Sequence, residues 1–440
     1  MSPATRTVLL LAVCVSSVGG PFTAGADEAR VLWRASLERP PRLPLARGGT
    51  SSAPRGELPL GSIFSGLFRD PKDPELTFWC VTDRGPNGQL LHDGVLRRTF
   101  AAPDFQPRIL KVRVRTGEPA RIEIAQQRPL RRADGRPVSG LPNHAAIDET
   151  PYDQSGRNAL PYDAGGLDPE DLVRLSDGSF WLAEEYGPTL VRVSPNGQVR
   201  ARVAPVGRGL VAGGFLVREE LPSVLGRRQP NRGFESLALS GDGRTLYAAS
   251  QSPLFHPDAA TGLRSRILRV FAFDAADGRP TAEHAVVLEA AATFGETDQN
   301  EVKVSALAWA GEGRLLVAER TDLRLRLQLV DLRGATNLLG SRWDDIIQRP
   351  ALEALDPEAL AAAGVVAAAK ELVLDVSALV PDAPAKLEGL AVIDASTIVI
   401  GNDNEYAIAG WDQKLRPVLA ARASELIAIR LPRPLPLRED

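Results

Sequence analysis

The chain has 440 residues, of which 44% are hydrophobic, and its 52 Lys plus Arg nearly balance its 55 Asp plus Glu. The formal net charge of −3 at pH 7 argues against nucleic acid as a partner. Two cysteines and four histidines, without a CxxC motif or a His pair at ligand spacing, argue against a zinc site and a disulfide framework.

The N-terminus predicts export. Arg6 precedes the apolar run 8–18, and Ala24-Gly25-Ala26 supplies a small-x-small cleavage pattern. This pattern indicates a signal peptide over residues 1–26 and a periplasmic or secreted protein. The run is too short to span a bilayer, and no other segment is a transmembrane candidate. A lipoprotein anchor at Cys14 is the alternative, although Val13 fits it poorly.

Residues 165–188 predict a β-hairpin. Two apolar runs flank Asp177-Gly178, a strong turn signal, and a turn centred there places Glu170 opposite Glu185. The acidic residues at both ends then meet away from the turn. Because like charges at that distance repel, a metal ion, a basic residue, a shared proton or a polar ligand must offset them.

The same pattern recurs along the chain, at 61–88, 231–250, 303–322 and 386–407. Further strand-like runs lie between these hairpins, so a unit of about four strands repeats irregularly, as in a β-propeller. We expect five to seven blades over 55–432, with six favoured because the interval from Ser65 to Glu170 can hold one more. Residues 27–54 can add a ring-closing strand, 343–373 predict a short helical insertion, and 433–440 form a tail.

A propeller brings equivalent strand ends together around a central channel. The acidic residues at the hairpin ends should therefore converge there: Asp83, Glu170, Glu185, Glu235, Glu319, Glu388 and Asp403. Polar and cationic residues accompany them: Arg84, Tyr186, Arg232, Arg320, Lys386 and Asn404.

The ordered motifs resemble one known family. "TDRGPNG" at 82–88, "DPEDL" at 168–172, "EEYGP" at 184–188, "NRGFESLAL" at 231–239 and "GNDNEY" at 401–406 are similar to the phytase-like proteins with esterase-like activity. The resemblance covers residues 55–430 and implies an exported β-propeller with phosphoesterase-like activity. Ser305 stands where the repeats at 165–188, 231–250 and 386–407 have Glu-x-Leu, so that blade lacks one ligand or never contributes one.

The acidic residues predict a site for Ca²⁺, which takes 6–8 oxygen ligands. The candidate metal ligands are Asp83, Glu170, Glu235, Glu388, Asp403 and Asn404. The candidate catalytic residues are Glu170, Glu185, Glu235, Glu388 and Arg84. The candidate substrate-binding residues are Arg232, Arg320, Lys386, His144 and Tyr186. Alternatively, the acids hydrogen-bond loop N–H groups or pair with arginines across blades.

These features predict a Ca²⁺-dependent hydrolase of small-molecule phosphoesters or related esters. Cations and a bound metal receive the charge of a phosphoester, and a metal also activates water. A Gly-x-Ser-x-Gly nucleophile motif is absent from the sequence. Two alternatives stay open: a non-catalytic propeller that binds a ligand or partner around a structural metal, and a lactonase-like Ca²⁺ hydrolase.

Overall fold

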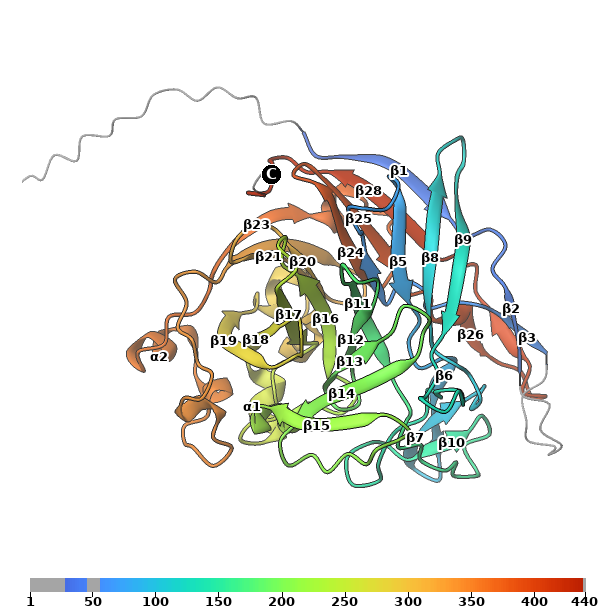
Figure 1. Ribbon diagram of the computed structural model, residues 1–440, viewed down its shortest axis with the longest axis horizontal. Helices are drawn as coiled ribbons and strands as arrows, with labels where there is room; N and C mark the ends of the chain where they lie inside the picture. The colour runs from blue at the N-terminus through green and yellow to red at the C-terminus, as the bar shows by residue number, and fades with distance from the viewer. Residues whose placement is uncertain (1–27, 46–55, 438–440) are drawn as a thin grey trace, which may run out of the picture.

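Five β-sheet blades surround a central axis in the computed structural model, which describes residues 28–45 and 56–437 (Figure 1). Each blade begins with an innermost strand, and these strands contact one another in a closed cycle: β4 Gly66–Phe68, β11 Pro169–Arg174, β16 Phe234–Leu239, β20 Lys303–Trp309 and β24 Leu387–Asp394. The predicted signal peptide (1–26) and Cys14 lie outside the described residues.

The first three blades follow chain order. Blade one continues outward through β5 Thr77–Val81, β8 Arg108–Arg115 and β9 Ala120–Pro129. Blade two continues through β12 Phe180–Glu184, β13 Thr189–Val193, β14 Val199–Pro205 and the parallel β15 Leu216–Leu221. Blade three continues through β17 Thr245–Ser250, β18 Ile267–Asp274 and β19 Pro280–Val287.

The N-terminal strand completes the last blade. Blade four adds β21 Arg314–Arg320, β22 Leu325–Asp331 and β23 Ala369–Asp375. Blade five adds β25 Thr397–Asn402, β28 Glu425–Arg430 and, antiparallel to β28, the strand β1 Arg30–Ser36. Since β1 also pairs in parallel with β9, it joins the fifth blade to the first, and the two form one eight-stranded sheet.

The prediction of a β-propeller is confirmed, and five blades lie within the predicted range. The favoured number of six is wrong for the part of the chain that the structure describes. The long interval before Glu170 holds a three-stranded sheet outside the ring: β6 Asn87–His92, β7 Val95–Phe100 and β10 Pro151–Asp153. The outer strands of blade one and two long connections, over residues 130–150 and 154–168, account for the rest of that interval.

Short helices lie in the connections. The predicted insertion at 343–373 contains η4 Arg342–Asp344, η5 Leu352–Ala354 and α2 Pro357–Ala362, but from Ala369 it forms β23. The other short helices are η1 Ser223–Arg227, α1 Ala259–Arg264, η2 Ala291–Phe294, η3 Gln299–Glu301, α3 Val376–Leu379 and η6 Glu405–Ala407. Two small sheets complete the fold: β2 Arg42–Pro44 with β3 Glu57–Pro59, and β26 Ile408–Trp411 with β27 Pro417–Leu419.

Large side chains fill the space between neighbouring blades. Trp79 of blade one meets Phe180 of blade two edge-to-face, with ring centroids 5.1 Å apart. The buried Asp171 accepts hydrogen bonds from its neighbour Leu172 N and, across to blade three, from Leu237 N, each 2.8 Å. Apolar packing and such polar links hold the innermost strands in a fixed arrangement, which positions the residues at their ends.

Candidate functional site

A β-bulge occurs at the same place in four blades. The register of the first two strands shifts between Pro169 and Asp171, and equivalent shifts occur in blades three, four and five. The residues at these bulges are Glu170, Glu235, Ser305 and Glu388. Because a bulge re-aims the side chain of the extra residue, the repeat presents one polar side chain in each of these four blades, near the end of its innermost strand.

The register predicted for the second blade is wrong by one residue. Leu175 N donates to Ser179 O at 2.8 Å, so the turn contains three residues, with Gly178 at φ +84°. Glu170 therefore does not face Glu185. Instead, Glu185 N donates to Asp168 O at 3.0 Å, which places Glu185 beside Asp168.

The second strand of each blade also places one residue beside the innermost strand. This residue lies one or two positions beyond the end of the second strand or, in blade four, at its last position. By strand pairing these residues are Asp83, Glu185, Gln251, Arg320 and Asp403. The residue before each of them has the opposite orientation, because side chains alternate along a strand. Glu319 accordingly pairs with Lys370 Nζ at 2.7 Å and accepts from Glu289 N at 2.9 Å. The expectation that Glu319 joins the channel acids is wrong for this reason.

Three carboxyl groups form a compact cluster, which we call the acid trio: Asp168, Glu170 and Glu185. Each offers an oxygen within 4.8 Å of the others, and all three residues are buried. Glu170 and Glu185 were predicted site residues. Asp168 was not, although it lies in the "DPEDL" motif, next to the strand that carries Glu170.

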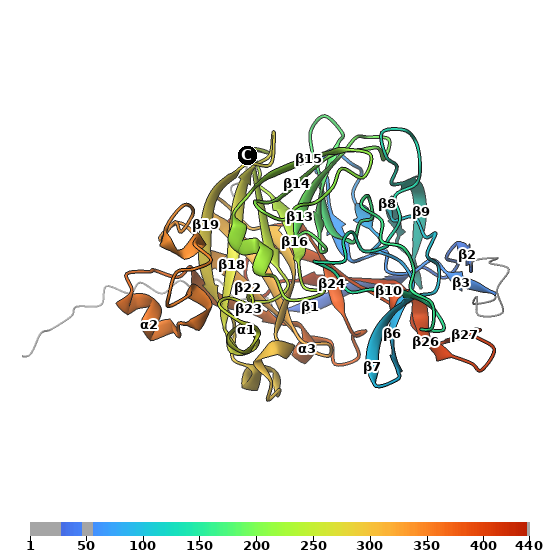
Figure 2. The same cartoon turned by 90° about the horizontal axis from the view of Figure 1, so that it is seen from below.

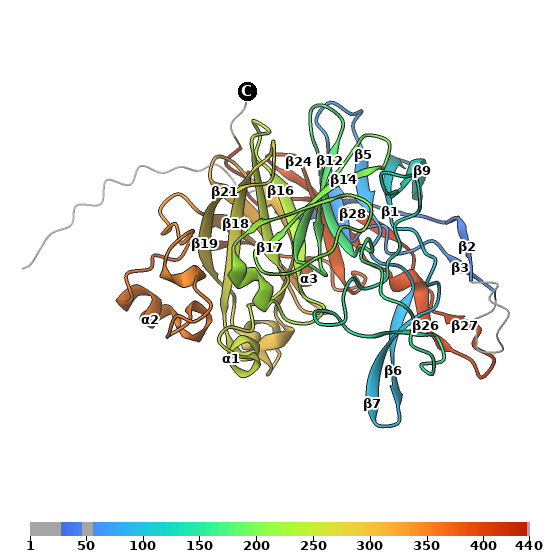
Figure 3. The ribbon, with the colours of Figure 1, turned by 60° about the horizontal axis from the view of Figure 1, so that its bottom comes forward.

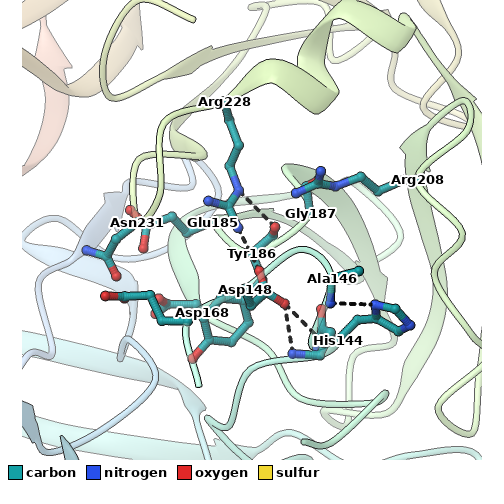
Figure 4. Close-up of polar contacts among 12 residues, drawn as sticks. His144, Ala146, Asp148, Asp168, Glu185, Tyr186, Gly187, Arg208, Arg228 and Asn231 are labelled. Atoms are coloured by element: carbon teal, nitrogen blue, oxygen red, sulfur yellow. Dashed lines mark hydrogen bonds and ion pairs between the residues drawn. The ribbon is translucent and has the colours of Figure 1, made fainter. Parts of the chain in front are cut away.

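Arg84 balances part of the charge of the trio. Its Nε lies 3.0 Å from Asp168 Oδ2, and its Nη2 lies 3.3 Å from Glu185 Oε2. The same guanidinium donates to Asn231 Oδ1 and lies 5.5 Å from the centre of the Tyr186 ring. Figure 4 shows Asp168, Glu185 and Asn231 on one side of Asp148. One arginine leaves negative charge uncompensated when all three carboxyls are ionised.

Burial and mutual repulsion raise the pKa of each carboxyl in the trio. Burial raises the pKa of Asp168 to about 6, with Arg84 opposing the shift. Burial and the neighbouring Asp168 raise the pKa of Glu185 to about 8. Burial and the charges of Asp168 and Glu235 raise the pKa of Glu170 well above its usual range. Without a cation the trio therefore holds protons near neutral pH.

The corresponding strand ends of blades three to five carry cations as well as acids. Arg320 forms an ion pair with Glu388, and Lys386 Nζ lies 2.7 Å from Glu405 Oε1. Burial is the main cause that raises the pKa of Glu388 to about 8, and repulsion from Asp403 adds to it. Gln251 Nε2 donates to Glu235 Oε1 at 2.5 Å, and burial raises the pKa of this glutamate to about 7.

Two further predicted ligands lie between blades one and five. Asp83 accepts from Tyr406 Oη and from Gly85 N, each at 2.9 Å. Burial and the charge of Asp403 raise the pKa of Asp83 to about 8. Asp403 Oδ1 accepts from Ser62 Oγ at 2.5 Å. Each of these aspartates has a second oxygen that no described hydrogen bond occupies.

Four predicted residues make contacts away from the acid trio. His144 lies on the far side of Asp148 in Figure 4, where its Nδ1 accepts from Ala146 N at 3.1 Å. The Tyr186 hydroxyl donates to Gly140 O at 2.6 Å, although its ring lies beside Arg84. Arg232 donates to Ser252 Oγ at 2.8 Å and to Asn300 O at 2.6 Å, whereas Asn404 Oδ1 accepts from Ser62 N at 2.9 Å.

The raised pKa values predict how stability depends on pH. With unfolded values near 4, Glu185, Asp83 and Glu388, each raised to about 8, keep protons in the folded protein that the unfolded chain has lost. The free energy of unfolding of the metal-free protein should therefore fall as pH rises from about 4 towards 8. Urea titrations in chelator at several pH values measure this slope. A stability that rises through this window would contradict the assigned protonation.

Hard divalent cations fit the donor set of the acid trio. Its three ligand groups supply oxygen only, and their spacing suits an ion bound at 2.3–2.6 Å from each oxygen. Among the described residues, the acid trio is the one group of three or more His, Cys, Asp or Glu side chains whose ligand atoms lie this close together.

A family model matches this chain over the region that carries these motifs, and a curated protein matches about half of the chain. The model of the phytase-like family, described as esterase-like activity of phytase, matches residues 59–406. An uncharacterized secreted protein of Arthroderma benhamiae is 25% identical over 274 residues, which is 53% of this chain and 51% of that protein. The chain thus spans about half the length of this curated relative.

Solved structures that align with most of this chain have low sequence identity to it. The PQQ-bound aldose sugar dehydrogenase of Streptomyces coelicolor aligns with a TM-score of 0.34 and 11% identity over 92% of this chain and 98% of that one. The calcium-binding protein regucalcin of Agrobacterium tumefaciens aligns with a TM-score of 0.31 and 14% identity over 87% and 98%. At such values the likeness bears on no activity. In the described residues, no helix is long and apolar enough to cross a membrane.

Proposed function

Because this chain belongs to the phytase-like family, we propose that it is a Ca²⁺-dependent hydrolase that cleaves phosphoesters or related esters at the channel mouth. The observation that carries the proposal is the acid trio, three buried carboxyls within 4.8 Å of one another that a single arginine only partly neutralises. We further propose that the protein is exported, since the relative from Arthroderma benhamiae is described as secreted.

The acid trio would hold the cation. Asp168, Glu170 and Glu185 supply the first oxygens, and Asp83 has one oxygen without a described hydrogen bond. Bound Ca²⁺ would polarise the ester and lower the pKa of water. Ca²⁺ would also replace the protons of the trio, because the cation and the protons compensate the same negative charge.

The cations around the mouth would bind the anionic part of the substrate. Arg320 is 2% exposed, and its Nε has no hydrogen-bond partner among the described residues. Arg84 and Lys386 complete the set on two other blades. A guanidinium donates two parallel hydrogen bonds to a phosphate, which fixes its orientation as well as its position.

Glu235 is the proposed general base. Its pKa of about 7 matches the pH at which a carboxylate both accepts a proton and is ionised in useful amounts. Gln251 holds one of its oxygens, so the other is available to take a proton from the attacking water. The charge of Glu185 raises the pKa of Glu235, and the charge of Arg320 lowers it. Glu235 therefore lies between the acid trio and the cations of blades four and five.

Calcium titration of the chelator-stripped protein tests the proposal. We expect added Ca²⁺ to raise the melting temperature and to switch on hydrolysis of p-nitrophenyl phosphate. A higher melting temperature without hydrolysis of phosphate or carboxylic esters would indicate a structural metal and overturn the enzymatic part. A lactone hydrolysed in place of the phosphoester would favour the lactonase-like alternative. No response of either quantity to Ca²⁺ would overturn the metal site itself.

A further inference from the structure

The β6–β7 hairpin leaves the ring close to the candidate site and exposes apolar side chains. It begins three residues after Arg84 and projects away from the blades (Figures 2 and 3). The exposed fractions near its tip are 39% for Leu90, 69% for Leu91, 57% for Val95 and 59% for Leu96. Four such residues in one hairpin expose apolar area that a solvated loop does not need.

Both faces of the hairpin tip are apolar. Leu91 pairs with Leu96 across the two strands, so these two side chains share one face. Leu90 and Val95 lie on the other face, because successive side chains alternate. A protein surface docked on one face would leave the other in water. In addition, four aliphatic side chains fall far short of the roughly 800 Å² per partner that a stable protein interface buries.

Arginines follow the apolar tip on each face. Arg97 lies on the face of Leu90 and Val95, donates to Gly156 O at 2.5 Å and stacks on Tyr152. Arg98 lies on the other face, pairs with Glu149 at 3.0 Å and donates to Asn87 Oδ1 at 3.1 Å, and its side chain is 11% exposed. A guanidinium has five N–H donors, so neither arginine uses all of its donors in these contacts. Apolar side chains next to the turn, followed by arginines, complement acyl chains below a layer of phosphate groups.

We propose that this hairpin inserts its tip into a phospholipid surface. Leu90, Leu91, Val95 and Leu96 enter the boundary between headgroups and acyl chains, about 5–10 Å deep. Arg97 and Arg98 then lie at the level of the lipid phosphates. Asp93, in the turn and 2.8 Å from His92 Nδ1, lies beyond these side chains, and its charge limits how far the tip enters. The proposal holds whether or not the candidate site is catalytic.

Co-sedimentation with vesicles tests the proposal. We expect the protein to sediment with vesicles of phosphatidylcholine and phosphatidylglycerol, and the double variant L91S/L96S to lose at least about tenfold in vesicle affinity, since each buried apolar side chain contributes to binding. The matched control is V366S/L372S, which removes two exposed apolar residues of another region and should bind as the unmodified protein does. Both variants change exposed residues, so circular dichroism should show unchanged folding.

A dye at the tip reports contact directly. Cys80 is buried, so an environment-sensitive fluorophore attached to L91C labels the hairpin selectively among the described residues. We expect a blue shift and protection from aqueous quencher when vesicles are added. Unchanged vesicle binding by L91S/L96S, or no binding by the unmodified protein, would overturn the proposal. A dimer in solution that L91S/L96S converts to a monomer, without vesicle binding, would also overturn it and assign the hairpin to contact between copies.

Discussion

Replacing Glu170 with glutamine should abolish the calcium-dependent rise in melting temperature and lower metal-dependent hydrolysis by about 10²-fold or more. The substitution preserves the shape of the side chain but removes one of the three anionic ligands of the acid trio. The loss of a ligand weakens the hold on the cation, and the reaction loses the charge stabilisation that the cation supplies. Isothermal calcium titration and initial rates with p-nitrophenyl phosphate measure the two effects separately.

In the calcium-free protein, the same substitution should have the opposite effect and raise the melting temperature. Burial and the charges of Asp168 and Glu235 disfavour the ionised form of Glu170, so its pKa is raised. A raised carboxyl pKa lowers stability as pH rises, and a neutral glutamine removes that penalty. We therefore expect E170Q to melt at a higher temperature than the unmodified protein in chelator at pH 8, and at a lower one in excess calcium.

Glu319→Gln is the matched control for this prediction. Glu319 is buried at the end of an equivalent strand, but it pairs with Lys370 instead of facing the channel. Its substitution breaks a buried ion pair but removes no ligand of the acid trio. It should therefore lower stability equally with and without calcium. A calcium response that E319Q loses and E170Q keeps would contradict the assignment of the trio.

The sequence alone predicts the repeat architecture well, because each blade carries its own local signal. Asp177-Gly178, Asp242-Gly243 and Glu312-Gly313 each mark a turn between the first two strands of a blade. The number of blades is harder to predict. The interval before Glu170 is long enough for another blade, but its strands β6, β7 and β10 build a projecting sheet, and strand patterns do not reveal which sheet a strand joins.

The detailed geometry of the site depends on single-residue shifts. A turn of three residues instead of two moves Glu185 from Glu170 to Asp168, and strand alternation directs Glu319 away from the channel. Counting from the turn does not reveal the bulge at Glu170 either. The acidic clusters therefore indicate the region of the site, whereas its members follow only from the backbone pairing.

The partners of the acids come from distant parts of the chain. Sequence reasoning placed Arg84 in the site without a specific partner, and its contacts to Asp168 and Glu185 cross from blade one to blade two. Such pairs depend on the closure of the ring. The sequence left four ways to offset the repulsion between the acids: a metal ion, a basic residue, a shared proton or a polar ligand. The structure contains the basic residue, Arg84, and the raised pKa values of Asp168 and Glu185 point to shared protons.

Replacing Arg84 with methionine should separate the metal site from substrate binding. Arg84 is 6% exposed and compensates Asp168 and Glu185, so its loss leaves buried charge unpaired and should cost about 3–5 kcal/mol in the calcium-free protein. Because protons can compensate the same carboxyls, the loss should be larger at pH 8 than at pH 5. Calcium should restore much of the stability at pH 8. Urea titrations at both pH values, with and without calcium, measure these differences.

Calcium should restore the stability of R84M but not its hydrolytic activity. If Arg84 binds the phosphate oxygens, R84M saturated with calcium should be folded yet about 10²-fold or more slower, since a preorganised cation stabilises the charge of the transition state. Arg108→Met is the control, because Arg108 stacks on Phe105, 5.4 Å from the ring centre, and no described ion pair links it to the trio. Full activity in calcium-saturated R84M would contradict the role of Arg84 in binding substrate. Equal stability of R84M and the unmodified protein at pH 8 without calcium would instead contradict the charged state of the trio.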